Sequence, residues 1–384
     1  MKMVKKILFT GLVSLVLLSC QMTEQCFADA QSELALAQTY EQDSNYGQAE
    51  AAYQNIVADY PDTNDALDAQ KRLTMLYFSI DKDQQGQAAF QKLVADFSEN
   101  ARIAQTVNQI ASYCSELKIH QKARQYYQYI LDNWPADPVA IWAKAGVVTS
   151  SISLADETAA DVATAKLLSD FSSHQYLRKA VFNIAAYSHW VGKYQRAKDV
   201  CQYILANWPE DEFAIWAQMD LAASYIGLGQ EKAAQAAIDK LVTDFNDHPK
   251  LNWARFVVGQ QYYLENRFTE AAAMWEQIMA GTPSFTDDEF AEAYLYMGDC
   301  YQRLGQYQKA IESYKMLADN YPDYKYAWHA LFSVGHGYQN LKQTGGISDS
   351  QADAKTRAAY EQLLQQYPDC KAAKAAERWL SRNN

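Results

Sequence analysis

The chain contains little glycine and proline, with 15 Gly and 8 Pro in 384 residues. These residues dominate turns and linkers, so their scarcity leaves little room for flexible connections between domains. Hydrophobic residues make up 49% of the chain and charged residues 21%, which is the composition of a chain that folds. The sequence therefore predicts a folded protein with few flexible linkers.

Positive charge is also scarce. Lys and Arg together number 34 against 46 Asp and Glu, so the formal net charge is −12. Such a surface repels the phosphates of nucleic acids, and no run of Lys or Arg offers them a local site. We expect no nucleic-acid partner.

Closely spaced pairs of cysteine are missing as well. The six cysteines are Cys20, Cys26, Cys114, Cys201, Cys300 and Cys370. Their spacing gives no disulfide framework. Cys114, Cys201 and Cys300 fall within helical patterns, where a free thiol behaves as a small apolar side chain. A bridge between Cys26 and Cys370 stays open, although nothing in the sequence supports it.

No motif of a catalytic or metal site is present. The chain has no glycine-rich phosphate loop, no Gly-x-Ser-x-Gly elbow and no cluster of Cys and His. His329 and His336 lie two helical turns apart, too far to bind one metal together. A hydrolase site at the loop Gln343–Ser350 would need a nucleophile together with a general base, and the sequence shows no such pair there. The sequence predicts no enzymatic activity, no metal and no cofactor.

The N-terminus has the layout of an export signal. Met1–Lys6 is basic, and Ile7–Leu18 is apolar over 12 residues. A membrane span needs about 20 apolar residues, so this run is too short for one. The residues Leu17-Leu18-Ser19-Cys20 resemble a bacterial lipobox. The resemblance implies a signal peptide over residues 1–19, a lipid (palmitate) on Cys20 and a lipidated tether over residues 20–30.

Two interpretations of localisation follow from this segment. Cys20 is followed by Gln21 rather than Asp. By resemblance to Gram-negative lipoproteins, this implies an outer-membrane lipoprotein that faces the periplasm. The alternative is a soluble secreted protein, cleaved after Ala30 in the sequence Ala28-Asp29-Ala30.

Small residues recur along the chain at a nearly constant step of 37. One series is Ala37, Thr74, Ala111, Val148, Ala185, Ala222, Gly259, Gly298 and Gly335. The second series is Ala49, Gly86, Ala123, Ala160, Ala197, Ala234, Ala271, Ala310 and Thr356. Two small residues per unit suit two helices that approach closely at fixed points. Self-similarity at this period is typical of a solenoid, in which each unit contacts mainly its neighbours.

The clearest unit, Tyr294–Pro322, resembles the tetratricopeptide (TPR) repeat. Gly298, Tyr301, Ala310 and Pro322 match its signature, and Tyr314 stands where the signature has Phe. The resemblance implies an all-α, right-handed superhelical solenoid of tandem antiparallel helix pairs. It covers residues 31–384 in about nine pairs, with a capping helix at Lys371–Arg382.

Local signals for turns and helix starts agree with this plan. Gly305 follows a first helix, where a residue in the left-handed αL conformation would end it, and equivalents are Gly192, Gly229 and Asn266. Thr286 and Glu289 predict a capping box. Asp137 before Pro138 predicts a helix N-cap followed by a proline at the first helical position.

A double period of 74 residues is superimposed on the repeat. Leu131–Pro135 recurs as Leu205–Pro209, and Lys92–Phe97 recurs near Lys166 and Lys240. This pattern indicates that the middle of the chain grew by duplication of a pair of units. Proline follows the aromatic residue that ends most second helices, and in the other units Ser98, Ser172 and Asn246 take its place.

The first helix of each TPR unit lines a concave groove. The resemblance therefore assigns partner contacts to Trp142, Phe182, Trp216, Trp253 and Phe256. Such aromatic side chains could anchor an extended peptide or a partner helix. The alternative is that they pack between helices, which the high average burial of large aromatic residues favours.

The leading functional hypothesis is a lipid-anchored scaffold that binds an envelope protein or peptide. At the level of repeats and lipobox, the chain is similar to TPR lipoproteins of the β-barrel assembly complex and to pilotins. The alternative is a glycan-binding envelope protein that stacks sugars on Trp142, Trp216 and Trp253.

Overall fold

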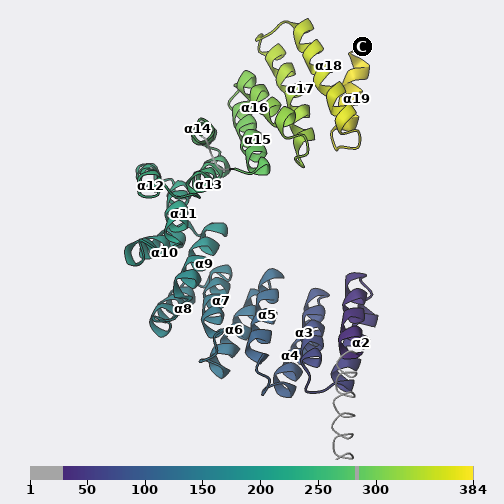
Figure 1. The fold of residues 1–384 in the computed structure, drawn as a ribbon, viewed down its shortest axis with the longest axis vertical. Helices are drawn as coiled ribbons and strands as arrows, with labels where there is room; N and C mark the ends of the chain where they lie inside the picture. The colour runs from purple at the N-terminus through teal and green to yellow at the C-terminus, as the bar shows by residue number, and fades with distance from the viewer. Residues whose placement is uncertain (1–28, 282–284, 384) are drawn as a thin grey trace, which may run out of the picture. The chain divides into compact units, whose positions relative to one another are not determined.

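The computed structural model describes residues 29–281 and 285–383. The predicted signal peptide and Cys20 lie outside the described residues. Within them the chain is helical, without a strand, and the helices pack in consecutive pairs (Figure 1). The all-α solenoid of helix pairs predicted from the sequence is thus confirmed.

A helix over residues 29–42 precedes the labelled helices. These are α2 (Tyr46–Asp59), α3 (Asn64–Ser79), α4 (Asp83–Asp96), α5 (Ile103–Glu116), α6 (His120–Asn133), α7 (Ala140–Ser153), α8 (Glu157–Asp170), α9 (Leu177–Trp190), α10 (Tyr194–Asn207), α11 (Ala214–Gly227), α12 (Glu231–Asp244), α13 (Leu251–Leu264), α14 (Phe268–Met279), α15 (Asp287–Arg303), α16 (Tyr307–Asn320), α17 (Ala327–Gln343), α18 (Asp349–Gln366) and α19 (Ala373–Arg382). The first helices of the pairs are the odd-numbered ones up to α17. The chain divides into two compact units, one ending at Ala180 and one beginning at Val181.

Both series of small residues lie in the buried contacts between helices. Their size matters most where glycine occupies the position. A Cβ atom at Gly259 of α13 would lie 2.7 Å from Nε1 of Trp275 on α14. A Cβ atom at Gly298 of α15 would lie 2.5 Å from Cε1 of Tyr314 on α16. Each first helix therefore accepts a large ring of its second helix only because the facing residue is small.

The turn inside each pair passes through one residue with positive φ. These residues are Ser44, Asp81, Lys118, Ala155, Gly192, Gly229, Asn266, Gly305 and Gly345. The αL assignments of Gly192, Gly229, Asn266 and Gly305 are confirmed. The turns of the first unit lack glycine, so ordinary L-residues such as Ala155, with φ 56°, adopt the left-handed conformation there.

Second helices end in two different backbone geometries. Trp134 and Trp208 precede proline, and their ψ angles are 57° and 59°. Phe97 and Phe245 precede Ser and Asn, and their ψ angles are 23° and 27°. Proline disfavours the helical region for the residue before it, which accounts for the larger ψ.

The packing of successive pairs follows the same division. Helices α6 and α10, which end before proline, pack extensively on the next first helices, α7 and α11. Helices α4 and α12 make little contact with α5 and α13, and the first helices α3 and α5, and α11 and α13, contact each other instead. The 74-residue double period therefore corresponds to an alternation of two kinds of junction. At a tight junction the second helix packs on the next first helix, and at a thin junction it makes little contact with that helix.

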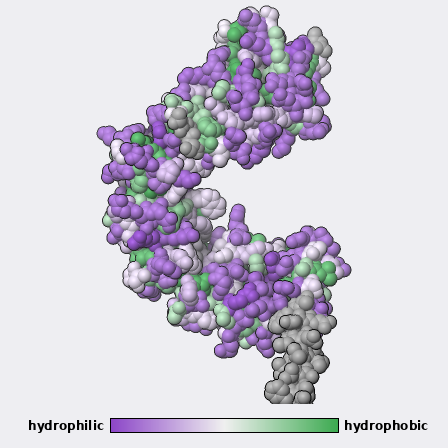
Figure 2. Space-filling view, viewed as in Figure 1, coloured by the Kyte–Doolittle hydropathy of each residue, from purple (hydrophilic) through white to green (hydrophobic). Residues whose placement is uncertain are grey.

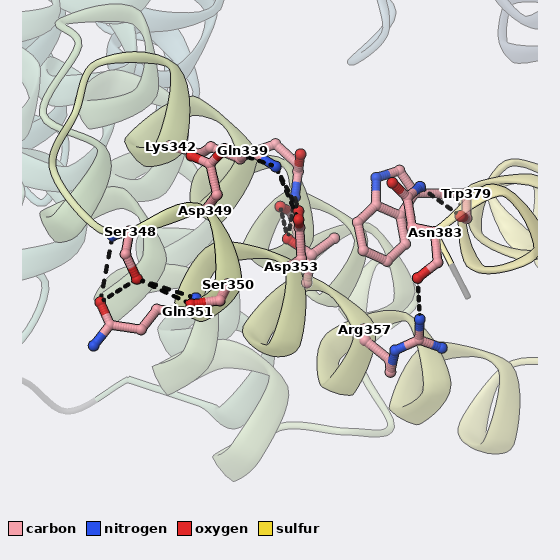
Figure 3. Close-up of polar contacts among 12 residues, drawn as sticks. Gln339, Lys342, Ser348, Asp349, Ser350, Gln351, Asp353, Arg357, Trp379 and Asn383 are labelled. Carbon is pink, nitrogen blue, oxygen red and sulfur yellow. Dashed lines mark hydrogen bonds and ion pairs between the residues drawn. The ribbon is translucent and has the colours of Figure 1, made fainter.

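Near the C-terminal end, polar contacts connect α17, α18 and the segment between them (Figure 3). The connection between these helices carries a capping box, in which Ser348 pairs with Gln351. Nζ of Lys342 lies 2.8 Å from Oδ2 of Asp353. The capping helix is α19, whose Trp379 ring packs edge-on against Tyr360 of α18 at 5.5 Å. This helix lies within the segment Lys371–Arg382, where the sequence predicts a capping helix.

One helix start was predicted wrongly. Helix α7 begins at Ala140, and Asp137 and Pro138 form a separate turn before it. The Asp137 carboxylate accepts a hydrogen bond from the N–H of Val139 at 2.8 Å, so its side chain caps that turn. The capping box of Thr286 and Glu289 at the start of α15 is confirmed.

Exchanging alanine and glycine at equivalent turns tests the left-handed turn geometry. We expect Ala155→Gly to raise the free energy of unfolding by about 0.5 to 1 kcal/mol, because glycine adopts positive φ without strain. The reverse change, Gly229→Ala, should lower it by about 1 kcal/mol, since nothing but backbone strain opposes its Cβ atom. Urea denaturation followed by far-UV circular dichroism measures both. Shifts of the same sign would contradict the assignment.

Candidate partner-binding surface

The aromatic residues predicted to contact a partner lie on first helices of both units. In the first unit, Trp142 of α7 is half-buried, and its ring lies 5.7 Å from that of Tyr176. In the second unit, Phe182 of α9 is half-buried and stacks on Phe213, the residue before α11, at 5.1 Å. Each ring therefore packs on the segment that leads into the following first helix.

Helices α11 and α13 carry the remaining predicted contacts. Trp216 of α11 and Trp253 of α13 are half-buried. Trp253 stacks on Phe256 at 5.2 Å with an interplanar angle of 13°. Phe256 is 0% exposed and also packs against Trp275 at 5.9 Å, so its side chain belongs to the interior and offers no surface to a partner.

The half-buried rings combine two properties that suit recognition. The rings of Trp142, Phe182 and Trp253 each pack against a neighbouring ring, so little side-chain entropy is lost when a partner covers their exposed parts. The face of the molecule seen in Figure 2 is mostly hydrophilic with separate apolar patches. Aromatic groups on such a surface are typical anchors of protein interfaces. Partner contact by Trp142, Phe182, Trp216 and Trp253 stays a prediction, as does the glycan alternative.

Trp190 at the end of α9 was not predicted to contact a partner. Its side chain is 79% exposed. The equivalent positions in neighbouring units hold Ser153, Gly227 and Leu264, so the repeat gives no aromatic series that would mark it. Leu264 is 69% exposed, which places an apolar side chain at the same point of α13.

A second surface was also missed. Grooves lie between the second helices α2 and α4 of the first unit, and between α10 and α12 of the second. Their linings consist largely of Gln, Ala, Leu and Tyr, which no motif singles out. The grooves could have been found from identical residues four repeat steps apart, such as Gln70 and Gln218.

A buried polar pair lies inside the second unit, one helical turn from Trp216. Oδ1 of Asp220 on α11 is 3.6 Å from Nδ1 of His189 on α9, and Asp220 is 4% exposed. Burial raises the pKa of Asp220 from 3.8 to about 7, and burial lowers the pKa of His189. Both shifts disfavour charge, so the pair tends toward its neutral form within the core.

The described residues contain no group of His, Cys, Asp and Glu arranged to hold a metal ion. Cys114, Cys201 and Cys300 are buried and free, and burial raises the pKa of Cys114 and Cys300 to about 12. These thiols stay protonated, as expected for small apolar side chains. Among the described helices, none is both long and apolar enough to span a bilayer.

Comparison with protein families identifies the repeat in two stretches of the chain. Residues 31–63 and 292–324 match the family model of the tetratricopeptide repeat. The second stretch contains the signature residues Gly298, Tyr301, Ala310, Tyr314 and Pro322, so the predicted TPR repeat is confirmed there. Curated proteins include no sequence that matches the chain.

Similar solved structures include a tetratricopeptide repeat protein from Parabacteroides merdae. It is 12% identical, covers 79% of this chain and 98% of its own, and has a TM-score of 0.38. The C-terminal part of a TPR repeat-containing protein from Cytophaga hutchinsonii is 14% identical over 78% of this chain and 99% of its own, with a TM-score of 0.36. PilW, a type IV pilus biogenesis factor, is 16% identical over 56% and 94%, with a TM-score of 0.34. These values are low, so the fold assignment rests on the helices of this chain.

Replacing the buried carboxyl tests the electrostatics of the pair. The unfolded chain releases the Asp220 proton near pH 3.8, whereas the folded chain keeps it to about pH 7. The free energy of unfolding therefore falls as pH rises through this window. We expect Asp220→Asn to stabilise the protein by about 2 to 4 kcal/mol at pH 8 and to have little effect at pH 4.

Urea denaturation at the two pH values measures this difference, with Asp239→Asn on the exposed side of α12 as the control. A loss of stability in Asp220→Asn at pH 8 would mean that the pair is charged in the folded protein.

Proposed function

We propose that the chain is a scaffold of the bacterial envelope that binds a partner protein or peptide through its first helices. Tetratricopeptide repeats generally bind protein partners, and two stretches of the chain match that repeat. The observation that carries the proposal is the set of half-buried aromatic rings on successive first helices of the second unit, Phe182, Trp216 and Trp253. Repetition along one side of a solenoid gives an extended binding surface rather than one catalytic site.

The spacing of these rings suggests the shape of the partner. Each anchor is supplied by a different helix pair. Trp216 and Trp253 occupy the same repeat position, 37 residues apart, and Phe182 lies three residues after the equivalent position, which is Lys179. An elongated peptide or a partner helix could therefore contact several pairs at once, with an apolar side chain against each ring.

A lipid on Cys20 would hold this scaffold at the outer membrane, facing the periplasm. Leu17-Leu18-Ser19-Cys20 supports this part of the proposal. The position of Ala30 gives further support, because Ala30 is fully buried in the helix over residues 29–42. Cleavage after Ala30 would cut a packed helix, whereas processing at Cys20 leaves it whole.

Removing the anchors tests the binding surface. A photo-crosslinking phenylalanine analogue at positions 182 and 216 should capture the partner in intact bacteria. Phe182→Ala and Trp216→Ala should then weaken binding of that partner at least tenfold, measured by calorimetry, because buried aromatic anchors dominate interface energies. Circular dichroism checks that the variants stay folded.

Tyr203 provides the matched control, since it is an exposed aromatic residue on the second helix α10. Tyr203→Ala should bind the partner normally. Capture from position 203 and not from 182 or 216 would contradict the proposed surface.

Replacing the lipidated residue tests the membrane anchor. Wild-type protein should incorporate labelled palmitate and sediment with membranes, and Cys20→Ser should lose both properties. Intact-mass analysis provides an independent readout. A mature wild-type chain that starts at Gln31 without a lipid would contradict the anchor and support simple secretion.

A further inference from the structure

A groove lies on the second-helix side of the first unit. Helices α2, α3 and α4 enclose about 420 Å³, and the adjoining loops after α2 and α4 enclose about 640 Å³ more. The floor is formed by Gln70, Leu73 and Tyr77 of α3, and small residues of α4, including Ala88 and Ala89, form one wall.

The second unit contains the corresponding groove. Helices α10, α11 and α12, with the loops after α10 and α12, enclose about 960 Å³. The floor is formed by Gln218, Leu221 and Tyr225 of α11, and Ala236 and Ala237 of α12 lie in the wall. Both grooves lie beside a second helix, α4 or α12, that makes little contact with the next first helix.

The two linings share nine identical residues at a separation of four repeat steps, or 148 residues. The identical pairs are Gln54 and Gln202, Gln70 and Gln218, Leu73 and Leu221, Tyr77 and Tyr225, Ala88 and Ala236, Ala89 and Ala237, Lys92 and Lys240, Asp96 and Asp244, and Phe97 and Phe245. Several of these side chains are exposed, so helix packing alone does not explain their identity.

The hydrogen bonds of the two floors are also the same. Gln70 donates from Nε2 to the carbonyl oxygen of Ala89 at 2.9 Å, and Gln218 donates likewise to Ala237 at 2.7 Å. Across the groove, Gln54 donates to the hydroxyl of Tyr77 at 3.3 Å. Gln202 donates to the hydroxyl of Tyr225 at 2.9 Å. Each groove thus has a floor whose shape is fixed by paired polar groups.

The intervening helices α6, α7 and α8 show that this floor is not required by the repeat. Lys144 stands where the grooves have Gln70 and Gln218, and Ser151 replaces the tyrosine. Nζ of Lys144 lies 3.9 Å from Oδ2 of Asp170 at the end of α8. In a fourth comparable triplet, α14, α15 and α16, Tyr294 stands at the glutamine position and Tyr301 at the tyrosine position. The Gln–Tyr floor is therefore specific to two of these four helix triplets.

The loop end of each groove is acidic. In the first unit the charged lining residues are Asp62, Asp96, Glu99 and Lys92. In the second unit they are Glu210, Asp211, Glu212, Asp244 and Lys240. Carboxylates exceed the lysine at both ends, and the chain as a whole carries a net charge of −12. A cationic ligand is favoured by this field.

We propose that the two grooves are equivalent docking sites for a basic peptide segment of a partner protein, one segment in each. An apolar side chain of the segment lies on the Leu–Ala floor, and Lys or Arg side chains lie against the acidic loops. One chain thus binds two copies of the same segment. These sites are separate from the proposed first-helix surface.

Selection of peptides tests the proposal without knowledge of the natural partner. A phage-displayed library of random 12-residue peptides is selected on the purified full chain, and the enriched peptides are synthesised. Calorimetry should give a stoichiometry of two peptides per chain, sequences enriched in Lys or Arg, and weaker binding at high salt. Ala88→Trp or Ala236→Trp should each reduce the stoichiometry to one, and the double variant should lose binding at least tenfold.

Gln87→Trp and Gln235→Trp are the matched controls, because they place the same ring one residue away on exposed positions outside the lining. Ala88→Lys and Ala236→Lys keep the test decisive if tryptophan disturbs folding, since lysine favours helices and repels a basic peptide. Failure to enrich any peptide would overturn the proposal. Enriched peptides that bind the double variant normally would also overturn it. If Trp216→Ala abolishes the binding of those peptides, the result would instead support the first-helix surface.

Discussion

The close approach of each first helix to its second helix is the constraint on which the rest of the structure depends. It is made at small residues, such as Gly259 facing Trp275 and Gly298 facing Tyr314. A solenoid has no central core, so each pair is held by its own interface and by its neighbours. Repetition of this contact keeps each first helix in register. It thereby decides which side chains face the interior and which remain available to a partner.

Signals within one helix pair could be predicted from the sequence. The small-residue series and Gly305 report local backbone and packing requirements, so they located the pairs and their turns correctly. The role of Asp137 was predicted wrongly because an aspartate side chain accepts the same kind of backbone hydrogen bond in a turn as at the start of a helix. Burial of the aromatic rings depends on neighbouring helices, which is why Phe256 could not be separated from Trp253 in advance. The grooves were not predicted from the sequence because the glutamine and alanine residues that line them form no recognisable motif.

Helix α11 shows how one element serves two surfaces. Trp216 lies on the side of the proposed first-helix surface, whereas Gln218, Leu221 and Tyr225 form the floor of a groove. Two residues along an α-helix correspond to a rotation of about 200°, so Trp216 and Gln218 point to opposite sides. The buried Asp220, one turn from Trp216, is accommodated in this arrangement because burial raises its pKa and favours the neutral carboxyl. A partner on one side of α11 therefore leaves the other side open.

The alternation between tight and thin junctions gives the solenoid an uneven mechanical compliance. At α6–α7 and α10–α11 a second helix is wedged against the next pair, whereas at α4–α5 and α12–α13 the first helices hold the pairs together. Within each unit, the two kinds of junction therefore differ in the helix that transmits a load to the next pair: a second helix at the tight junctions and a first helix at the thin ones.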